Sequence, residues 1–510
     1  MRFKIITAIA VLIMMMALTL TGCGGSASGG GSADTDSVTV EDLASIKMFT
    51  SRDLSGEYDE ASATKIKLSD EDVTIDREGV YILCGKLQGQ VNIDADDEAK
   101  IQIVLDGVEI TNDNSAAIYV KSANKVFVTL AEGSENSLKV TGKYEADGDT
   151  NVDSVIFSKD DLTINGSGKL AISSAKGHGI VSKDDLVITG GNIDITAGKK
   201  GLDAHNSIRI ADGQLKIEAG TDGLHSEDED KGVGFVYIKD GEINIASGDD
   251  GIHAYTDLVV EAGSVKISKS CEGLEGNTVI INGGTVDVTS EDDGFNAVSS
   301  KSKKSGQQEG QNSEQNSRQN SEAPANDETA WICINGGKIH VDAEGDGLDS
   351  NGSLKITSGT TVVEGPSRMG NGSVDVGEGG EAVITGGTFM AASASGMGVN
   401  FSENSKQGAI LTNCDSATGK IEVKDSDGNV IASMKTDKSF QCVQVSAPDI
   451  KKGQTYTISA GGSNQEIKME SLIYGQAAGP GAGPGAGPEG SGAGPEAPPN
   501  GERPDSQNSL

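Results

Sequence analysis

Apolar and polar residues alternate in a series of short segments between about residue 155 and residue 400. Each segment follows a glycine, as in Asn192-Ile193-Asp194-Ile195 and Gln214-Leu215-Lys216-Ile217. Alternation with a period of two predicts a short β-strand with one buried face. The pattern returns about every 22 residues, in Glu242–Ile245, Ser264–Ile267, Thr285–Val288 and Lys338–Val341.

Two further features complete the repeat. Another apolar strand precedes each leading glycine, for example around Leu186 and Ile188. Ten residues after the leading glycine, a second glycine precedes one apolar residue. These second glycines are Gly201, Gly223, Gly251, Gly273, Gly294 and Gly347. We expect the glycines to supply corner conformations with φ > 0.

This repeat predicts an all-β fold, a right-handed parallel β-helix with two or three strands per turn. One turn cannot bury its apolar face, whereas turns stacked about 4.8 Å apart can. A propeller blade needs about 40–45 residues, and a leucine-rich repeat needs a different leucine pattern, so both folds are excluded.

The predicted β-helix domain covers residues 60–404, with less regular first coils up to about residue 150. Insertions fall at corners: a short acidic loop at 227–232, and a Gln/Ser/Asn-rich stretch at 300–329 that we expect to be disordered. Residues 405–470 lose the glycine period, and the sequence Asp425-Ser426-Asp427-Gly428 is typical of a hairpin turn. We therefore predict a small C-terminal antiparallel β module there, followed by a disordered Gly/Pro-rich tail at 471–510.

The N-terminus has the pattern of an export signal. Arg2 and Lys4 precede an apolar run, and residues 1–22 end in a sequence that resembles a bacterial lipobox, Leu20-Thr21-Gly22-Cys23. The resemblance implies a lipoprotein signal peptide with lipidation of Cys23; an ordinary signal with a coincidental cysteine is the alternative. Residues 23–59 are then a tether, and the protein is anchored by lipid at the extracellular face of the bacterial cell membrane.

Charge and cysteine content narrow the function further. The formal net charge of −36 excludes a nucleic-acid partner bound through a basic face. The cysteine spacing excludes a zinc ribbon. Cys414 and Cys442 flank one β segment, so they could pair or remain free thiols. We expect a monomer.

Candidate metal ligands appear when the units are aligned on the second glycine. The residue before it is Lys200, Asp222, Asp250, Glu272, Asp293 or Asp346. The residue two positions after it is Asp203, His225, His253, Glu275, Asn296 or Asp349, and Asp249 and Asp292 add further acids. Carboxylates stacked at the coil spacing repel one another unless a cation lies between them, and Ca²⁺ can bridge oxygens at that spacing. The alternatives are ordinary Asp-Gly turn chemistry and zinc held by His225 and His253.

Residues 147–153 resemble the first half of an EF-hand loop. They lack the glycine and the final glutamate of that motif, which leaves a looser calcium loop as the hypothesis.

Several repeated phrases resemble one known family. They are Asp160–Gly166, Ser247–Ala254, Cys271–Gly276, Ile281–Thr285 and Asp292–Ala297. They are similar to the calcium-containing, carbohydrate-binding β-helix proteins of clostridial and other Gram-positive surfaces, which are structurally related to pectate lyases. The resemblance implies a parallel β-helix with bound calcium and a pectin- or cellulose-type polysaccharide as the partner. Lys200, Cys271 and the 300–329 insertion depart from the family pattern.

Three functions fit this sequence. The first is a non-catalytic, calcium-dependent polysaccharide-binding protein, with His225, His253 and Tyr255 as candidate ligand-binding residues beside Phe295 and Trp331. The second is a calcium-dependent polysaccharide lyase with Lys200 as the base, although Lys200 could instead form a salt bridge with the stacked acids. The third is a structural or adhesive surface solenoid in which calcium only stabilises the fold.

Overall fold

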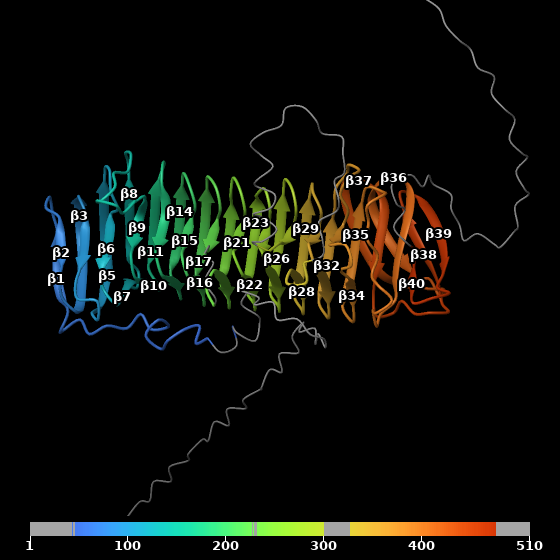
Figure 1. Ribbon diagram of the computed structural model, residues 1–510, viewed down its shortest axis with the longest axis horizontal. Coiled ribbons are helices and arrows are strands. Elements are labelled where there is room, and N and C mark those ends of the chain that lie inside the picture. Colours follow the sequence, from blue (N-terminus) through green and yellow to red (C-terminus); the bar gives the residue numbers. More distant parts are fainter. Residues whose placement is uncertain (1–42, 44–45, 227, 229–231, 300–326, 476–510) are drawn as a thin grey trace, which may run out of the picture.

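The computed structural model describes residues 43, 46–226, 228, 232–299 and 327–475 (Figure 1). The predicted signal peptide, Cys23, most of the 300–329 insertion and nearly all of the predicted tail lie outside the described residues. No helix within the described part of the chain is long and apolar enough to cross a membrane.

The main body is a parallel β-solenoid, which confirms the predicted parallel β-helix. Each regular coil supplies three strands, and equivalent strands of successive coils pair in parallel to form three columns. The first column comprises β7 (Lys125–Leu130), β10 (Asp161–Gly166), β13 (Asp185–Ile188), β16 (Ser207–Ile210), β19 (Phe235–Ile238), β22 (Asp257–Val260), β25 (Thr278–Ile281), β28 (Trp331–Ile334), β31 (Ser353–Ile356) and β34 (Ala382–Ile384).

The second and third columns complete each coil. The second comprises β8 (Glu135–Val140), β11 (Lys169–Ser174), β14 (Asn192–Ala197), β17 (Gln214–Ala219), β20 (Glu242–Ala246), β23 (Ser264–Lys269), β26 (Thr285–Ser290), β29 (Lys338–Ala343), β32 (Thr360–Glu364) and β35 (Thr388–Ser393). The third is a 12-stranded sheet of β2 (Val73–Ile75), β4 (Val91–Asp94), β6 (Ile118–Ser122), β9 (Ser154–Ser158), β12 (His178–Ser182), β15 (Leu202–Ala204), β18 (Leu224–Ser226), β21 (Ile252–Ala254), β24 (Leu274–Gly276), β27 (Phe295–Ala297), β30 (Leu348–Ser350) and β33 (Val374–Val376). The less regular first coils add β1 (Thr64–Leu68), β3 (Gly79–Gln88) and β5 (Lys100–Asn112), and β5 pairs with both β7 and β8.

The interior of the solenoid is filled by the apolar residues of the alternating pattern. Ile193 of β14 pairs in register with Leu215 of β17, and Ile195 pairs with Ile217. All four side chains are buried. The branched aliphatic residues favour strands and stack on their equivalents in the next coil, so burial is continuous along the axis.

The two glycines of each repeat serve different physical purposes. The leading glycines do adopt positive φ, for example 95° at Gly191 and 114° at Gly241, as expected. The second glycines do not, so the expectation was wrong for them. A Cβ on Gly251 would lie 2.6 Å from the carbonyl oxygen of Gly273 and 2.5 Å from Cδ1 of Ile267. These positions require glycine because neighbouring coils approach too closely for a side chain.

The C-terminal β module is present and is mainly antiparallel, as predicted. β36 (Ala409–Lys424) and β37 (Val430–Ser446) form a long hairpin, and β38 (Thr455–Ala460) and β39 (Ser463–Lys468) follow. β37 also pairs antiparallel with β35 of the last coil, while the short β40 (Ile473–Tyr474) pairs in parallel with β36. The hairpin turns at Asp425, whose backbone amide donates to Asn429. Cys414 and Cys442 are free thiols.

An N-terminal segment, here called the strap (residues 43 and 46–59), lies along the outside of the first column (Figure 1). At one end, Leu43, Ile46 and Met48 pack with Val259 and Ile280. At the other end, Asp53 bonds to β7 and β10. The described part of the predicted tether (23–59) instead packs against the solenoid, on an outer surface that is apolar at one end and polar at the other.

Candidate functional site

The predicted metal ligands form two adjacent rows on the outside of the third column. One row, here called the strand row, lies in the middle of the strands, where cross-strand pairing sets the order Asp203, His225, His253, Glu275, Asn296, Asp349 and Asp375. The other, here called the corner row, contains the residue before each second glycine: His178, Lys200, Asp222, Asp250, Glu272, Asp293 and Asp346. The second-glycine amides donate to the corner-row carbonyls of the next coil, as Gly223 does to Asp250 at 2.9 Å, which holds the corner row in register.

The N-terminal end of the two rows is balanced in charge. The Nζ of Lys200 lies 3.3 Å from Oδ1 of Asp203 and 3.8 Å from Oδ2 of Asp222. The Nδ1 of His225 lies 2.9 Å from the same Asp203 oxygen. Although burial acts in the opposite direction, the His225 hydrogen bond and the Lys200 charge lower the pKa of Asp203. Lys200 therefore forms the salt bridge that was the alternative to its role as a base.

The middle of the rows holds two buried carboxylates beside a histidine. Asp250 is 7% exposed and Glu275 is 5% exposed. The Nδ1 of His253 lies 3.2 Å from Asp250 and 3.9 Å from Glu275. Burial, and then the negative charge of Glu275, raises the pKa of Asp250. The same two causes raise the pKa of Glu272, although the 2.8 Å hydrogen bond that Asn296 donates to it acts in the opposite direction.

The C-terminal end of the rows consists of acids. Burial and the neighbouring acids raise the pKa of Asp293 to about 6, of Asp346 to about 8 and of Asp349 to about 7. Burial also raises the pKa of Asp375. Within the described part of the chain, no Lys, Arg or His lies within ion-pair distance of these four carboxylates. Asp375 could not be predicted from the repeat, because it lies outside the regular glycine spacing.

Backbone groups hold these C-terminal carboxylates in position. The amide of Asp346 donates to Oδ1 of Asp293 at 2.6 Å, and the amide of Gly372 donates to Oδ1 of Asp346 at 2.5 Å. A Cβ on Gly345 would lie 2.4 Å from Oδ1 of Asp292 and also 2.4 Å from Oδ1 of Asp293. Because Gly345 has no side chain, both carboxylate oxygens can lie close together against its backbone.

Three groups of ligand atoms, each within 4.8 Å of one another, occur among the described residues. Two belong to the rows above: Asp250 with His253 and Glu275, and Asp222 with Asp249 and Asp250. Four of the predicted metal ligands, Asp222, Asp249, Asp250 and Glu275, therefore belong to such groups. The other six, Asp203, Glu272, Asp292, Asp293, Asp346 and Asp349, belong to none of them.

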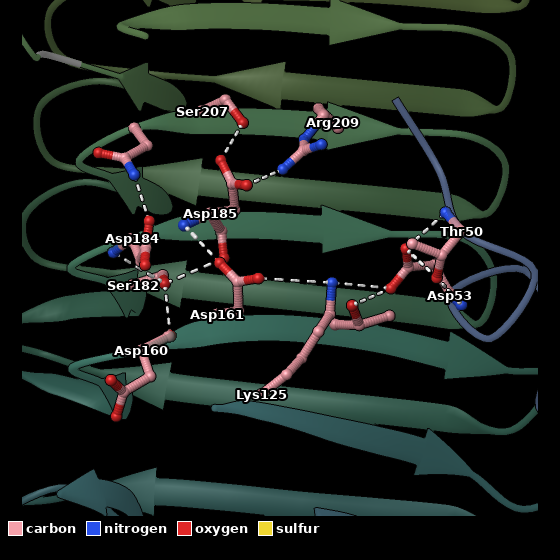
Figure 2. A network of polar contacts seen from close by, with 12 residues as sticks. Thr50, Asp53, Lys125, Asp160, Asp161, Ser182, Asp184, Asp185, Ser207 and Arg209 are labelled. Atoms are coloured by element: carbon pink, nitrogen blue, oxygen red, sulfur yellow. Dashed lines mark hydrogen bonds and ion pairs between the residues drawn. The ribbon is translucent and has the colours of Figure 1, made fainter. Parts of the chain in front are cut away.

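The third group lies at another corner, where the third column leads into the first (Figure 2). It contains Asp161, Asp184 and Asp185. Burial raises the pKa of Asp161 to about 6, against the charge of Lys125, whose Nζ lies 3.8 Å away. Arg209 pairs with Asp185, so cations partly balance this group. This group was not predicted, although the Asp-Asp pairs at 160–161 and 184–185, where the first-column strands begin, were a signal for it.

The remaining candidates lie elsewhere or have other partners. Phe295 is buried in the core, Trp331 packs with the strap residues, and Tyr255 is half-buried beside Gly234. In the proposed EF-hand-like loop, Asp147 lies 3.3 Å from Lys121, and Asp153 lies 2.6 Å from Lys199. These lysines compete with a cation for the loop acids.

A profile of the carbohydrate-binding domain-containing protein family matches residues 69–313 and 272–367, more than half of the chain. The chain belongs to this family. The matched residues include the third-column strands from β4 to β30 and both rows of candidate ligands up to Asp349.

Two relatives resemble this carbohydrate-binding domain-containing protein over part of its length. One, from Acetivibrio thermocellus, carries the same family description and is 41% identical over 135 residues, which is 26% of this chain and 47% of that relative. A solved structure, described as a polysaccharide lyase-like protein from C. thermocellum in a gadolinium derivative, is 33% identical. The match covers 44% of this chain and 93% of that chain, with a TM-score of 0.39.

Proposed function

We propose that this protein is a surface-anchored, non-catalytic polysaccharide-binding protein whose binding depends on calcium. Membership of the carbohydrate-binding domain family supports the ligand class. The observation that carries the calcium proposal is the set of carboxylates at the C-terminal end of the two rows, Asp292, Asp293, Asp346, Asp349 and Asp375.

The donors at this end are all oxygens, the type that calcium prefers, and an ion would have to draw them together, because no three of these carboxylates bring oxygen atoms within 4.8 Å of one another among the described residues. Calcium prefers six to eight oxygen ligands, mostly from carboxylates and carbonyls, at about 2.3–2.6 Å. The Asp292 and Asp293 oxygens lie close together against the backbone of Gly345, and backbone amides orient Asp293 and Asp346. Bound calcium would neutralise the repulsion that otherwise opposes ionisation here.

This arrangement also suggests the polysaccharide class. With a net charge of −36, the protein repels an acidic polymer unless a cation lies between them. Calcium at the rows can share its coordination between protein carboxylates and the carboxylates of a pectin-type uronate chain. A cellulose-type chain has no carboxylate, so its binding would not require calcium.

We further propose that the protein is attached to the outer face of the cell membrane through lipid on Cys23. The lipobox-like sequence supports this attachment. Two signals are usually needed for stable anchoring, and the two acyl chains of a diacylglycerol on Cys23 would meet that requirement.

Calorimetric titration of the secreted chain carrying Cys23→Ser tests the binding proposal. Oligogalacturonate and cello-oligosaccharide are titrated in calcium and in EDTA, and ultraviolet absorbance is followed for unsaturated product. We expect oligogalacturonate to bind only with calcium and without product. Growth of absorbance would overturn the non-catalytic assignment, and binding unchanged by EDTA would overturn the calcium dependence. If neither sugar binds while calcium still raises the melting temperature, the binding proposal is overturned and a structural role for calcium is favoured.

A further inference from the structure

Beyond the calcium proposal, we propose that Asp250, His253 and Glu275 form a separate site for a borderline divalent cation of the Zn²⁺ or Co²⁺ type. The site lies in the middle of the two rows, upstream of the all-carboxylate end. It adds a nitrogen ligand to the oxygens, which calcium does not favour and zinc does.

The three ligand atoms converge on one point. Asp250 and His253 come from one coil, at the corner and in β21, while Glu275 comes from β24 of the next coil. Both carboxylates face the same ring nitrogen: Nδ1 of His253 lies 3.2 Å from Oδ2 of Asp250 and 3.9 Å from Oε2 of Glu275. Ligand atoms around a tetrahedral zinc, at about 2.0–2.2 Å from the metal, are separated by similar distances.

His340 shows that a histidine between two acids need not form such a site. Its Nδ1 lies 2.8 Å from Asp287, whereas its Nε2 lies 2.9 Å from Glu364. The two acids therefore lie on opposite sides of the ring, and each ring nitrogen is engaged by one carboxylate. No single position there can be shared by all three ligands.

The fold restricts the orientation of the ligands at the proposed site. The ring of His225 meets that of His253 edge to face, with centroids 4.9 Å apart, which limits rotation of the His253 ring. Parallel pairing places His253 directly opposite Glu275, so the spacing of these two ligands is set by the backbone. A ligand set fixed in this way loses little side-chain entropy when the cation binds.

Burial explains why this section would gain from a cation. Asp250 and Glu275 are both more than nine-tenths buried. Lys200 pairs with Asp222 one coil upstream and with Asp203 two coils upstream. A bound divalent cation would lower the cost of ionising the two buried carboxylates.

The test uses the secreted chain with Cys23→Ser, stripped of metal and held in excess calcium. Co²⁺ is the spectroscopic probe, because its visible absorption reports nitrogen coordination, and Zn²⁺ affinity is measured by calorimetry. We expect His253→Gln to weaken Zn²⁺ binding at least about tenfold and to remove the Co²⁺ band. His340→Gln is the matched control and should leave both unchanged.

Two further variants keep the result interpretable. Glu275→Gln should weaken Zn²⁺ binding while keeping side-chain volume, and melting in EDTA shows whether each variant is folded. Asp346→Asn/Asp349→Asn should lose calcium binding but keep Zn²⁺, so this inference and the proposed calcium site can fail separately. Zn²⁺ affinity that is absent in the parent chain, or unchanged in folded His253→Gln, would overturn the proposal.

Discussion

The Asp53 carboxylate lies 2.9 Å from the Nζ of Lys125, joining the strap to β7 of the solenoid (Figure 2). Asp53 also accepts a 2.8 Å hydrogen bond from Thr163 of β10, and its side chain is 2% exposed. The pair is therefore buried at a junction between segments that are distant in sequence. The strap and the first coils should unfold together.

We expect Asp53→Ala to lower the free energy of unfolding by about 1.5–3 kcal/mol, because it removes the hydrogen bonds that the Asp53 carboxylate accepts and leaves Lys125 with only the more distant Asp161, 3.8 Å away. Urea denaturation followed by circular dichroism measures the change. Glu57→Ala alters an exposed acid of the same strap and should change stability by less than about 0.5 kcal/mol. Equal effects of the two substitutions would show that the buried pair does not hold the strap.

Gly251→Ala should destabilise the solenoid by at least about 2 kcal/mol. The new Cβ would meet the Gly273 carbonyl oxygen at 2.6 Å, and a backbone atom cannot move aside without shifting a coil. Thermal melting of the purified variant measures the loss.

Gly398→Ala is the matched control for that substitution. Its Cβ would find only side-chain atoms, the nearest being Cδ1 of Leu411 at 3.4 Å, and its φ is not positive. We expect a melting temperature close to that of the parent chain. If both glycine variants melt alike, close approach is not the reason for glycine at position 251.

Asp346→Asn/Asp349→Asn should change stability in opposite directions with and without calcium. In EDTA the variant should melt higher than the parent, because two mutually repelling buried charges are removed. With calcium at 100 times its Kd, the parent should gain about 2.7 kcal/mol and the variant little. A calcium-induced shift that is equal in both proteins would place the ion elsewhere.

The contacts of His340, which lies on the second column, predict that the stability of the protein depends on pH. The hydrogen bond between His340 and Glu364 is the main cause that raises the pKa of His340 from 6.5 to about 9. Burial lowers this pKa, while the hydrogen bond to Asp287 raises it further. Because the folded pKa is the higher one, this stabilisation is complete below about pH 6.5 and is lost as the pH rises to about 9. The pair is partly exposed, so we expect a loss of less than about 1 kcal/mol.

Denaturation at several pH values in that range measures the His340 contribution. His340→Gln should abolish this part of the pH dependence, and Glu364→Gln should reduce it. A slope that is the same in all three proteins would assign the pH dependence to other groups.

The repeat, the parallel columns and the order of residues in both rows, except for His178 and Asp375 at their ends, could be predicted from the sequence. These features follow from local alternation and from glycines at fixed spacing, and stacking of identical coils turns sequence period directly into spatial register. The C-terminal hairpin at Asp425 was predictable for a similar reason, since turn chemistry is local.

Which acids have a cation beside them depends on the tertiary packing. Lys200 lies beside Asp203 and Asp222, whereas among the described residues the charged neighbours of Asp293, Asp346 and Asp349 are acids. The sequence gives both groups the same column position. The length and burial of the neighbouring side chains decide which of these acids has a cation beside it. The same factors bring Asp250 and Glu275 close to His253. The position of the strap also depends on tertiary packing. Residues 46–59 carry no repeat, and they are held in place by contacts with strands far along the chain.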